Sequence, residues 1–148
     1  MERVEDYGIK RIVVAVDISD YSVMVMARAS AMAIAFSAEI HVISVVGLPK
    51  LIVSEADIGI QDVRLREKEF QENHKRLIDE HLKGRDLHIE SRVLHGDPSG
   101  KILSYANEIN ADLIVMGSKA YGKIQRLFLG GVSEDVVRNA KCSVMIAR

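Results

Sequence analysis

Arg11 to Val16 reads RIVVAV, which is apolar without interruption after its first residue and rich in β-branched side chains. Asp112 to Met116 (DLIVM) and Cys142 to Ala147 (CSVMIA) have the same character. Alternation of polar and apolar residues indicates a strand with one face in water, whereas continuous apolar runs are typical of strands that are covered on both faces. These three runs therefore predict a parallel sheet enclosed between helices.

Two further short segments complete a set of five expected strands. They are Glu39 to Val46 and Leu87 to Leu94. Helices are expected between the strands, at Asp20 to Ser37, Gln61 to Lys83, Ser99 to Asn110 and Val132 to Ala140. Because strand and helix alternate along the chain and such crossovers are right-handed, the sequence predicts an α/β fold with a doubly wound sheet and helices on both faces.

One apolar segment lies where a loop is expected. Gly47 to Ile60 reads GLPKLIVSEADIGI. It either packs over a ligand or partner, or contains a short regular element. We favour packing, because long loops in compact domains are often functional.

The composition suits one compact domain over residues 1–148, with 48% hydrophobic and 28% charged residues. The net charge of -1 shows that the chain as a whole is not basic, although a local basic patch is still possible. No nucleic-acid partner is therefore expected. The single cysteine, Cys142, cannot form an intramolecular disulfide, which is compatible with a reducing cytoplasm. The polar residues 1–7 do not resemble a signal peptide, and the apolar stretch Ala27 to Phe36 is too short to cross a bilayer. We therefore expect a cytoplasmic protein with no membrane partner.

Ligands of doubly wound sheets bind beyond the carboxyl ends of the strands, where the strand order reverses. This rule nominates Asp17, Val45 to Gly47, His95 to Ser99, and Gly117 to Gly131.

The last of these segments is the most informative, because it reads GSKAYGKIQRLFLGG and leads directly into an expected helix. Backbone N–H groups at a glycine-rich helix start are a common phosphate site, and Lys119, Lys123 and Arg126 could assist. A flexible loop before a helix has the same pattern, so the residues alone leave both interpretations open. Neither a P-loop nor a G-x-G-x-x-G pattern is present.

The motifs of the chain, taken in order and spacing, resemble the universal stress protein family from Lys10 to Ile146. The matching pieces are Val14-Ala15-Val16-Asp17 with Ser19 and Ser22, Gly96-Asp97-Pro98 with Ile102, Ala111 to Ser118, Leu129 to Glu134, and Cys142 to Ile146. The resemblance implies a five-stranded parallel sheet in the order 3-2-1-4-5. It also implies that an adenine nucleotide, ATP or else AMP or ADP, binds together with Mg²⁺.

The residues implied for nucleotide binding come from four segments. They are Ala15, Val16 and Asp17 along the nucleotide, Val45 at the adenine, Met116, Gly117 and Ala120 near the ribose and phosphates, and Gly130, Gly131, Val132 and Ser133 at the distal phosphates.

ATP-binding members carry glycine, two residues, glycine, nine residues, then glycine followed by serine or threonine. This chain has Gly117 and Gly130 at the right distance, but Ala120 replaces the second glycine and Gly131 replaces the hydroxyl residue. Loss of one hydrogen bond costs about 0.5–1.5 kcal/mol. A non-glycine residue at positive φ costs about 1–2 kcal/mol. We therefore expect weaker binding than in members with the full motif.

Other candidates have structural interpretations. Asp97, which precedes Pro98, is expected to cap a helix. Ser133 is expected to cap the last helix in addition to contacting a phosphate. Asp17 could cap the first helix instead of contacting a ligand. His95 is expected on the surface, and Cys142 as a small buried side chain.

The last strand, Cys142 to Arg148, would lie at the edge of the sheet. An apolar edge strand is a template for pairing, and the resemblance implies a homodimer through it. Two function classes remain: an adenine-nucleotide-binding regulatory module of the stress response, or a family member that acts only through contacts with unknown protein partners. No nucleophile elbow, Ser-His-Asp spacing or metal cluster is evident, so at most slow ATP hydrolysis is expected.

Overall fold

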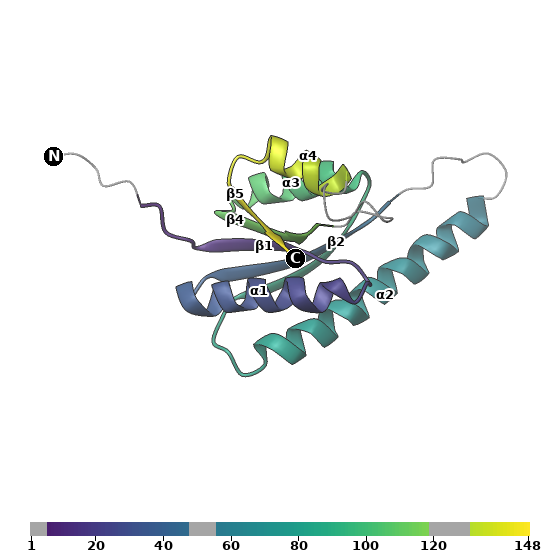
Figure 1. Cartoon of the computed structure of the whole chain (residues 1–148). Helices are drawn as coiled ribbons and strands as arrows, with labels where there is room; N and C mark the ends of the chain where they lie inside the picture. Colours follow the sequence, from purple (N-terminus) through teal and green to yellow (C-terminus); the bar gives the residue numbers. More distant parts are fainter. Residues whose placement is uncertain (1–5, 48–55, 119–130) are drawn as a thin grey trace.

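The computed structural model of the chain describes residues 6–47, 56–118 and 131–148 (Figure 1). Its strands are β1 (Arg11–Ala15), β2 (Glu39–Val46), β3 (Ile89–His95), β4 (Leu113–Gly117) and β5 (Ser143–Ala147). They form one sheet in the order β3-β2-β1-β4-β5, and every neighbouring pair is parallel. The predicted fold class and strand order are confirmed.

Four helices cover the sheet in two layers (Figure 1). They are α1 (Tyr21–Phe36), α2 (Ala56–Leu82), α3 (Pro98–Glu108) and α4 (Gly131–Asn139). α1 and α2 lie on one face, and α3 and α4 on the other. This arrangement explains the continuous apolar runs, because successive strand residues point to opposite faces and both faces are buried.

The two faces have separate cores that meet in β1. Ile12 and Val14 pack under α1 and α2, whereas Val13 packs under α3 and α4. All three side chains are fully buried. A polar substitution at any of these three positions would therefore disturb one of the two layers.

The expected element boundaries are correct to within two residues except at α2. We predicted this helix from Gln61, with residues 47–60 as a loop, but it begins at Ala56. Once a helix has formed, each added residue gains a backbone hydrogen bond, so α2 extends through Gly59 despite the low helix propensity of glycine. The remainder of that segment, residues 48–55, lies outside the described residues.

The inner side of α2 carries an apolar stripe whose residues recur at seven-residue spacing. Phe70 and Leu77 are buried and Val63 is half-buried. His74 lies on the same side and is completely buried, with Nε2 2.7 Å from the Ser44 hydroxyl and Nδ1 2.8 Å from the Ser91 hydroxyl. Sequence analysis assigned no role to this histidine.

Burial lowers the pKa of His74 to about 4, so the ring is neutral in the folded protein at pH 7. In the unfolded chain its pKa is near 6.5. The unfolded state therefore binds more protons between these values, and the free energy of unfolding falls as the pH drops from about 6.5 to 4.

We predict that His74 alone removes about 3 kcal/mol of stability over this window, 1.36 kcal/mol for each pKa unit. Urea unfolding of the wild type and of His74→Gln at pH 7 and pH 4.5 measures it. The stability difference between the two proteins should shrink at the lower pH. A constant difference would contradict a neutral buried His74.

Candidate functional site

The strand order reverses between β1 and β4, and the chain leaves β1 through a tight corner at Asp17. One carboxylate oxygen of Asp17, Oδ1, accepts hydrogen bonds from the Ser19 N–H at 2.9 Å and the Ser19 hydroxyl at 2.5 Å. The Ser22 hydroxyl donates to the Asp17 carbonyl oxygen at 2.5 Å. Asp17 thus shapes the turn into α1, while Asp20, at the N-cap position, makes no side-chain capping bond.

Across the reversal, α4 begins beside the end of β4. Ser133, which is 1% exposed, donates its hydroxyl to the Gly117 carbonyl oxygen at 3.0 Å. We had expected this serine to cap α4. It is the third residue of the helix, and its hydroxyl ties the helix to the strand end instead of accepting from the helix. Gly131 and Val132, at the start of α4, are exposed.

Two of the predicted site residues turn their side chains into the core instead of toward the strand ends. Val16 packs into the core under α1 and α2, and Met116 into the core under α3 and α4. Only the backbones of these two residues are thus positioned to meet a ligand. Ala15, Asp17, Val45 and Gly117 are half-buried at the strand ends.

Part of the predicted site lies outside the described residues. This applies to Lys119, Ala120, Lys123, Arg126 and Gly130.

The side chains of the nominated segment His95 to Ser99 have structural partners. His95 lies 3.5 Å from Glu67 of α2, measured from Nε2 to a carboxylate oxygen. Asp97 caps α3 as predicted, accepting from the Gly100 N–H at 2.9 Å. Cys142 precedes β5 and is half-buried, and burial raises the pKa of its thiol, so it stays protonated at neutral pH.

A hollow of about 230 Å³ opens beside the carboxyl end of β2. Val45, Val46 and Gly47 line one side, and Asp62, Val63, Arg66 and Phe70 of α2 line the other. Sequence analysis nominated the β2 side but not the α2 side. The seven-residue repeat that includes Val63 and Phe70 was the signal that could have identified α2 as the second wall.

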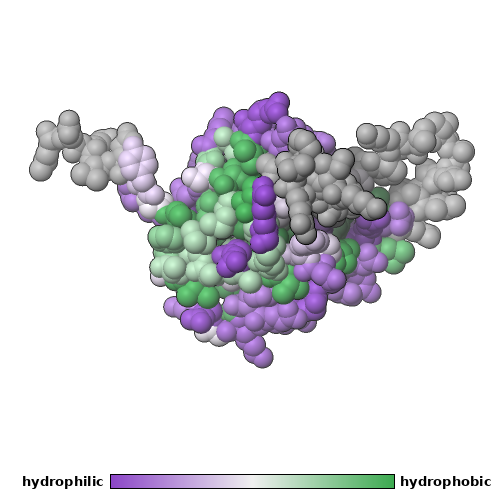
Figure 2. Space-filling view, viewed as in Figure 1, coloured by the Kyte–Doolittle hydropathy of each residue, from purple (hydrophilic) through white to green (hydrophobic). Residues whose placement is uncertain are grey.

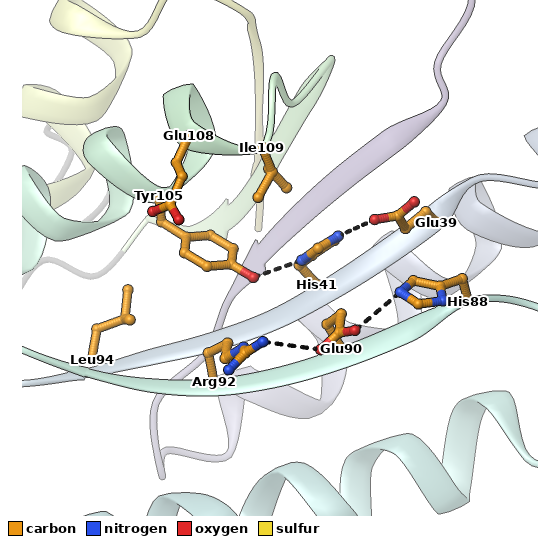
Figure 3. Close-up of a pocket in the computed structure, with 9 residues that line it drawn as sticks. All are labelled: Glu39, His41, His88, Glu90, Arg92, Leu94, Tyr105, Glu108 and Ile109. Carbon is orange, nitrogen blue, oxygen red and sulfur yellow. Dashed lines mark hydrogen bonds and ion pairs between the residues drawn. The ribbon is translucent and has the colours of Figure 1, made fainter.

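A larger hollow of about 430 Å³ lies on the α3 side of β2 and β3, and sequence analysis missed it (Figure 3). His41 stands at its centre, with Nε2 2.5 Å from Glu39 and Nδ1 2.7 Å from the Tyr105 hydroxyl. His88 and Arg92 flank Glu90 at 3.1 and 3.6 Å. The alternating polar residues at 88, 90 and 92 were the available signal, since they share one face of β3.

Three polar side chains of this larger hollow, Glu39, His41 and Tyr105, are hydrogen-bonded in a row. The hydrogen bond from His41 lowers the pKa of Glu39, and burial raises the pKa of Tyr105. A carboxylate at Nε2 requires the proton on that nitrogen, so in the neutral form of the ring Nδ1 accepts from the Tyr105 hydroxyl. The arrangement is a closed chain of donors and acceptors between β2 and α3.

Across residues 6–47, 56–118 and 131–148, no group of three or more His, Cys, Asp or Glu side chains is arranged to hold a metal ion. In the same part of the chain, no helix is long and apolar enough to cross a membrane.

Comparison with known proteins decides the family. The sequence model of the universal stress protein family matches residues 8–148. The chain belongs to the universal stress protein family. A universal stress protein of Methanocaldococcus jannaschii is 31% identical over 140 residues, which cover 94% of this chain and 82% of the relative.

Solved structures of universal stress proteins share the fold. The universal stress protein UspA of Lactobacillus plantarum superposes with a TM-score of 0.85 at 21% identity, over 95% of this chain and 99% of that one. A universal stress protein solved in complex with cAMP gives a TM-score of 0.66 at 25% identity, over 95% of this chain and 98% of the other.

Proposed function

We propose that this universal stress protein binds an adenine nucleotide in the crevice between the ends of β1 and β4, as a regulatory module of the stress response. The proposal rests on two structural features that lie where the strand order reverses between β1 and β4. The Asp17 corner follows β1, and the start of α4 is tied to the end of β4 through Ser133 and Gly117. Strand-order reversals are the usual ligand sites of such sheets.

The residues at this point fit a nucleotide. The first N–H groups of a helix lack partners within the helix, and the positive end of its dipole favours phosphate. Among the described residues, no atom lies within 4 Å of a β-carbon added at Gly131, so these residues leave room beside the helix start. We assign the phosphates to Gly130, Gly131, Val132 and Ser133.

We assign the adenine base and the ribose to residues at the ends of the strands. Backbone groups of Ala15, Val16 and Met116, together with Asp17, Gly117 and Ala120, would line the ribose and first phosphate. Val45 and the hollow beside it would take the adenine, since apolar concave surfaces suit flat bases. The relative solved with cAMP supports an adenine nucleotide as the ligand class. If the ligand is ATP, Mg²⁺ would bind together with it, at its phosphates.

A second function deserves a test because of two departures from the family motif. Ala120 and Gly131 replace a glycine and a hydroxyl residue of the ATP-binding pattern. A member that had lost nucleotide binding would act through protein contacts alone. Nucleotide titration separates the two functions.

We predict saturable binding of Mg-ATP to the nucleotide-stripped protein at micromolar to sub-millimolar concentration, and a loss of about tenfold or more in Val132→Glu. The new carboxylate would lie beside the phosphates, and tenfold corresponds to about 1.4 kcal/mol of repulsion. Because an acidic residue in the first turn favours the helix dipole, the variant should remain stable. Isothermal calorimetry with ATP and AMP measures both affinities, and AMP should lose less.

Val137→Glu is the matched control. It introduces the same side chain on the same helix at a similarly exposed position, 46% against 38%, but two turns from the helix start. Equal losses in both variants would contradict phosphate binding at the start of α4. Absence of binding by the wild type at millimolar ATP would favour the protein-contact function.

We also propose that the chain forms a homodimer through the edge strand, residues Cys142 to Arg148. Apolar surface gathers on the side of the molecule where Figure 1 places β5, as Figure 2 shows. Val144, Met145 and Ile146 of β5 are only half-buried. Unpaired edges of this kind favour pairing with a second chain.

Sedimentation velocity at micromolar concentration should show a dimer for the wild type and a monomer for Ile146→Glu, because a charge on the edge strand opposes pairing. Ser104→Glu, on the exposed side of α3, should remain dimeric. Monomeric wild-type protein would refute the interface.

A further inference from the structure

Two neighbouring residues of α2 hold the peptide units on either side of Asp17. Asn73 donates from Nδ2 to the Asp17 carbonyl oxygen at 2.9 Å. His74 acts through Ser44, whose hydroxyl donates to the Val16 carbonyl oxygen at 2.6 Å. We propose that Asn73 and His74 are positioning residues that fix the Asp17 corner and thereby set nucleotide affinity from α2. This inference rests on the proposed function.

The orientation of the Asn73 amide follows from its second partner. Arg76 donates to Asn73 Oδ1 at 2.8 Å, so the oxygen of the amide faces Arg76 and the nitrogen faces Asp17. Asn73 is 7% exposed, and a buried amide in this setting has one favourable orientation. The Asp17 carbonyl therefore has two donors, Asn73 from α2 and Ser22 from α1.

The protonated nitrogen of His74 follows from the same reasoning. The Ser44 hydroxyl gives its proton to Val16, so it can only accept from His74, which places the ring proton on Nε2. Nδ1 then accepts from the Ser91 hydroxyl. A chain of hydrogen bonds thus runs from the exposed Ser91 of β3 through the buried His74 and Ser44 to the end of β1, with each donor matched to one acceptor.

These contacts matter for binding because they orient the Val16–Asp17 and Asp17–Ile18 peptide units. Both units lie at the strand end where the nucleotide is proposed to bind. The core holds the side chain of Val16, and Ser19 and Ser22 contact the carboxylate of Asp17. The carbonyl contacts from Ser44 and Asn73 hold the two peptide units themselves. α2 also lines the hollow beside Val45, which places the base and the corner under one helix.

The test combines NMR of the whole protein without nucleotide and calorimetry with Mg-ATP. The Ile18 amide nitrogen shares a peptide unit with the Asp17 carbonyl, so loss of the Asn73 hydrogen bond in Asn73→Ala should shift its ¹⁵N resonance. The Asp17 amide reports the Val16 carbonyl in the same way for His74→Gln. Each variant should also bind Mg-ATP about threefold to tenfold more weakly, the effect of one lost hydrogen bond.

Two controls separate positioning from general stability. Asn139→Ala removes an amide that donates to a backbone carbonyl at the same 2.9 Å, at the far end of α4, and should change neither readout. Leu77→Val weakens the packing of α2 without touching the corner, and at a temperature where it is folded it should bind Mg-ATP like the wild type.

Shifted Ile18 and Asp17 amides together with weaker binding, in the two test variants alone, would support the inference. Unchanged amides, or shifted amides with unchanged affinity, would overturn it while the proposed function stands. If the wild type binds no nucleotide, the proposed function fails and the role in binding fails with it. The amide shifts would then still show whether α2 fixes the corner.

Discussion

The parallel pairing of β1 with β4 is the contact on which the candidate site depends. Residues 12–14 lie opposite residues 113–115, and these strands are buried on both faces. The chain builds β2 and β3 on one side of β1 and then crosses to β4 on the other. α1, the helix after β1, covers one face of the sheet, and α4, the helix after β4, covers the other. In doubly wound sheets, a strand-order reversal of this kind is where a ligand crevice is expected.

Local hydrogen bonds hold the backbone at the proposed site. Asp17 folds back on Ser19, and Ser133 joins α4 to the last residue of β4. Behind the corner, Asn73 and the Ser44 hydroxyl occupy the two carbonyls at the end of β1. Unpaired buried carbonyl groups cost free energy, so these partners are required for a strand that ends inside the molecule. The requirements of folding and the geometry of the site thus coincide.

The sequence was sufficient to predict the fold, because the continuous apolar runs at 11–16 and 112–116 leave a two-sided parallel sheet as the consistent arrangement. The strand order came from family resemblance, since periodicity does not specify which strands are neighbours. The start of α2 was missed because Gly59 and the surrounding β-branched residues have low helix propensity, and the gain from extending an existing helix outweighs it.

Side-chain partnerships were harder to predict than the elements. Asp97 was predicted correctly because its partner lies three residues away, whereas the hydroxyl of Ser133 bonds to Gly117, sixteen residues away. His74 was assigned no role from the sequence, because its partners, Ser44 and Ser91, come from two strands that are distant along the chain. The larger hollow around His41 likewise joins three elements. Such long-range polar contacts leave little trace in a single sequence.

The central claim is that the β1–β4 crevice, and not the larger hollow around His41, is where an adenine nucleotide binds. A ¹H–¹⁵N NMR titration of the protein with Mg-ATP tests it most directly. The account predicts that the amides of residues 17–19 and 131–133 shift with a common affinity, while those of residues 88–92 and 105–109 remain unchanged. Shifts confined to residues 88–92 and 105–109 would contradict the account, as would the absence of shifts at millimolar ATP.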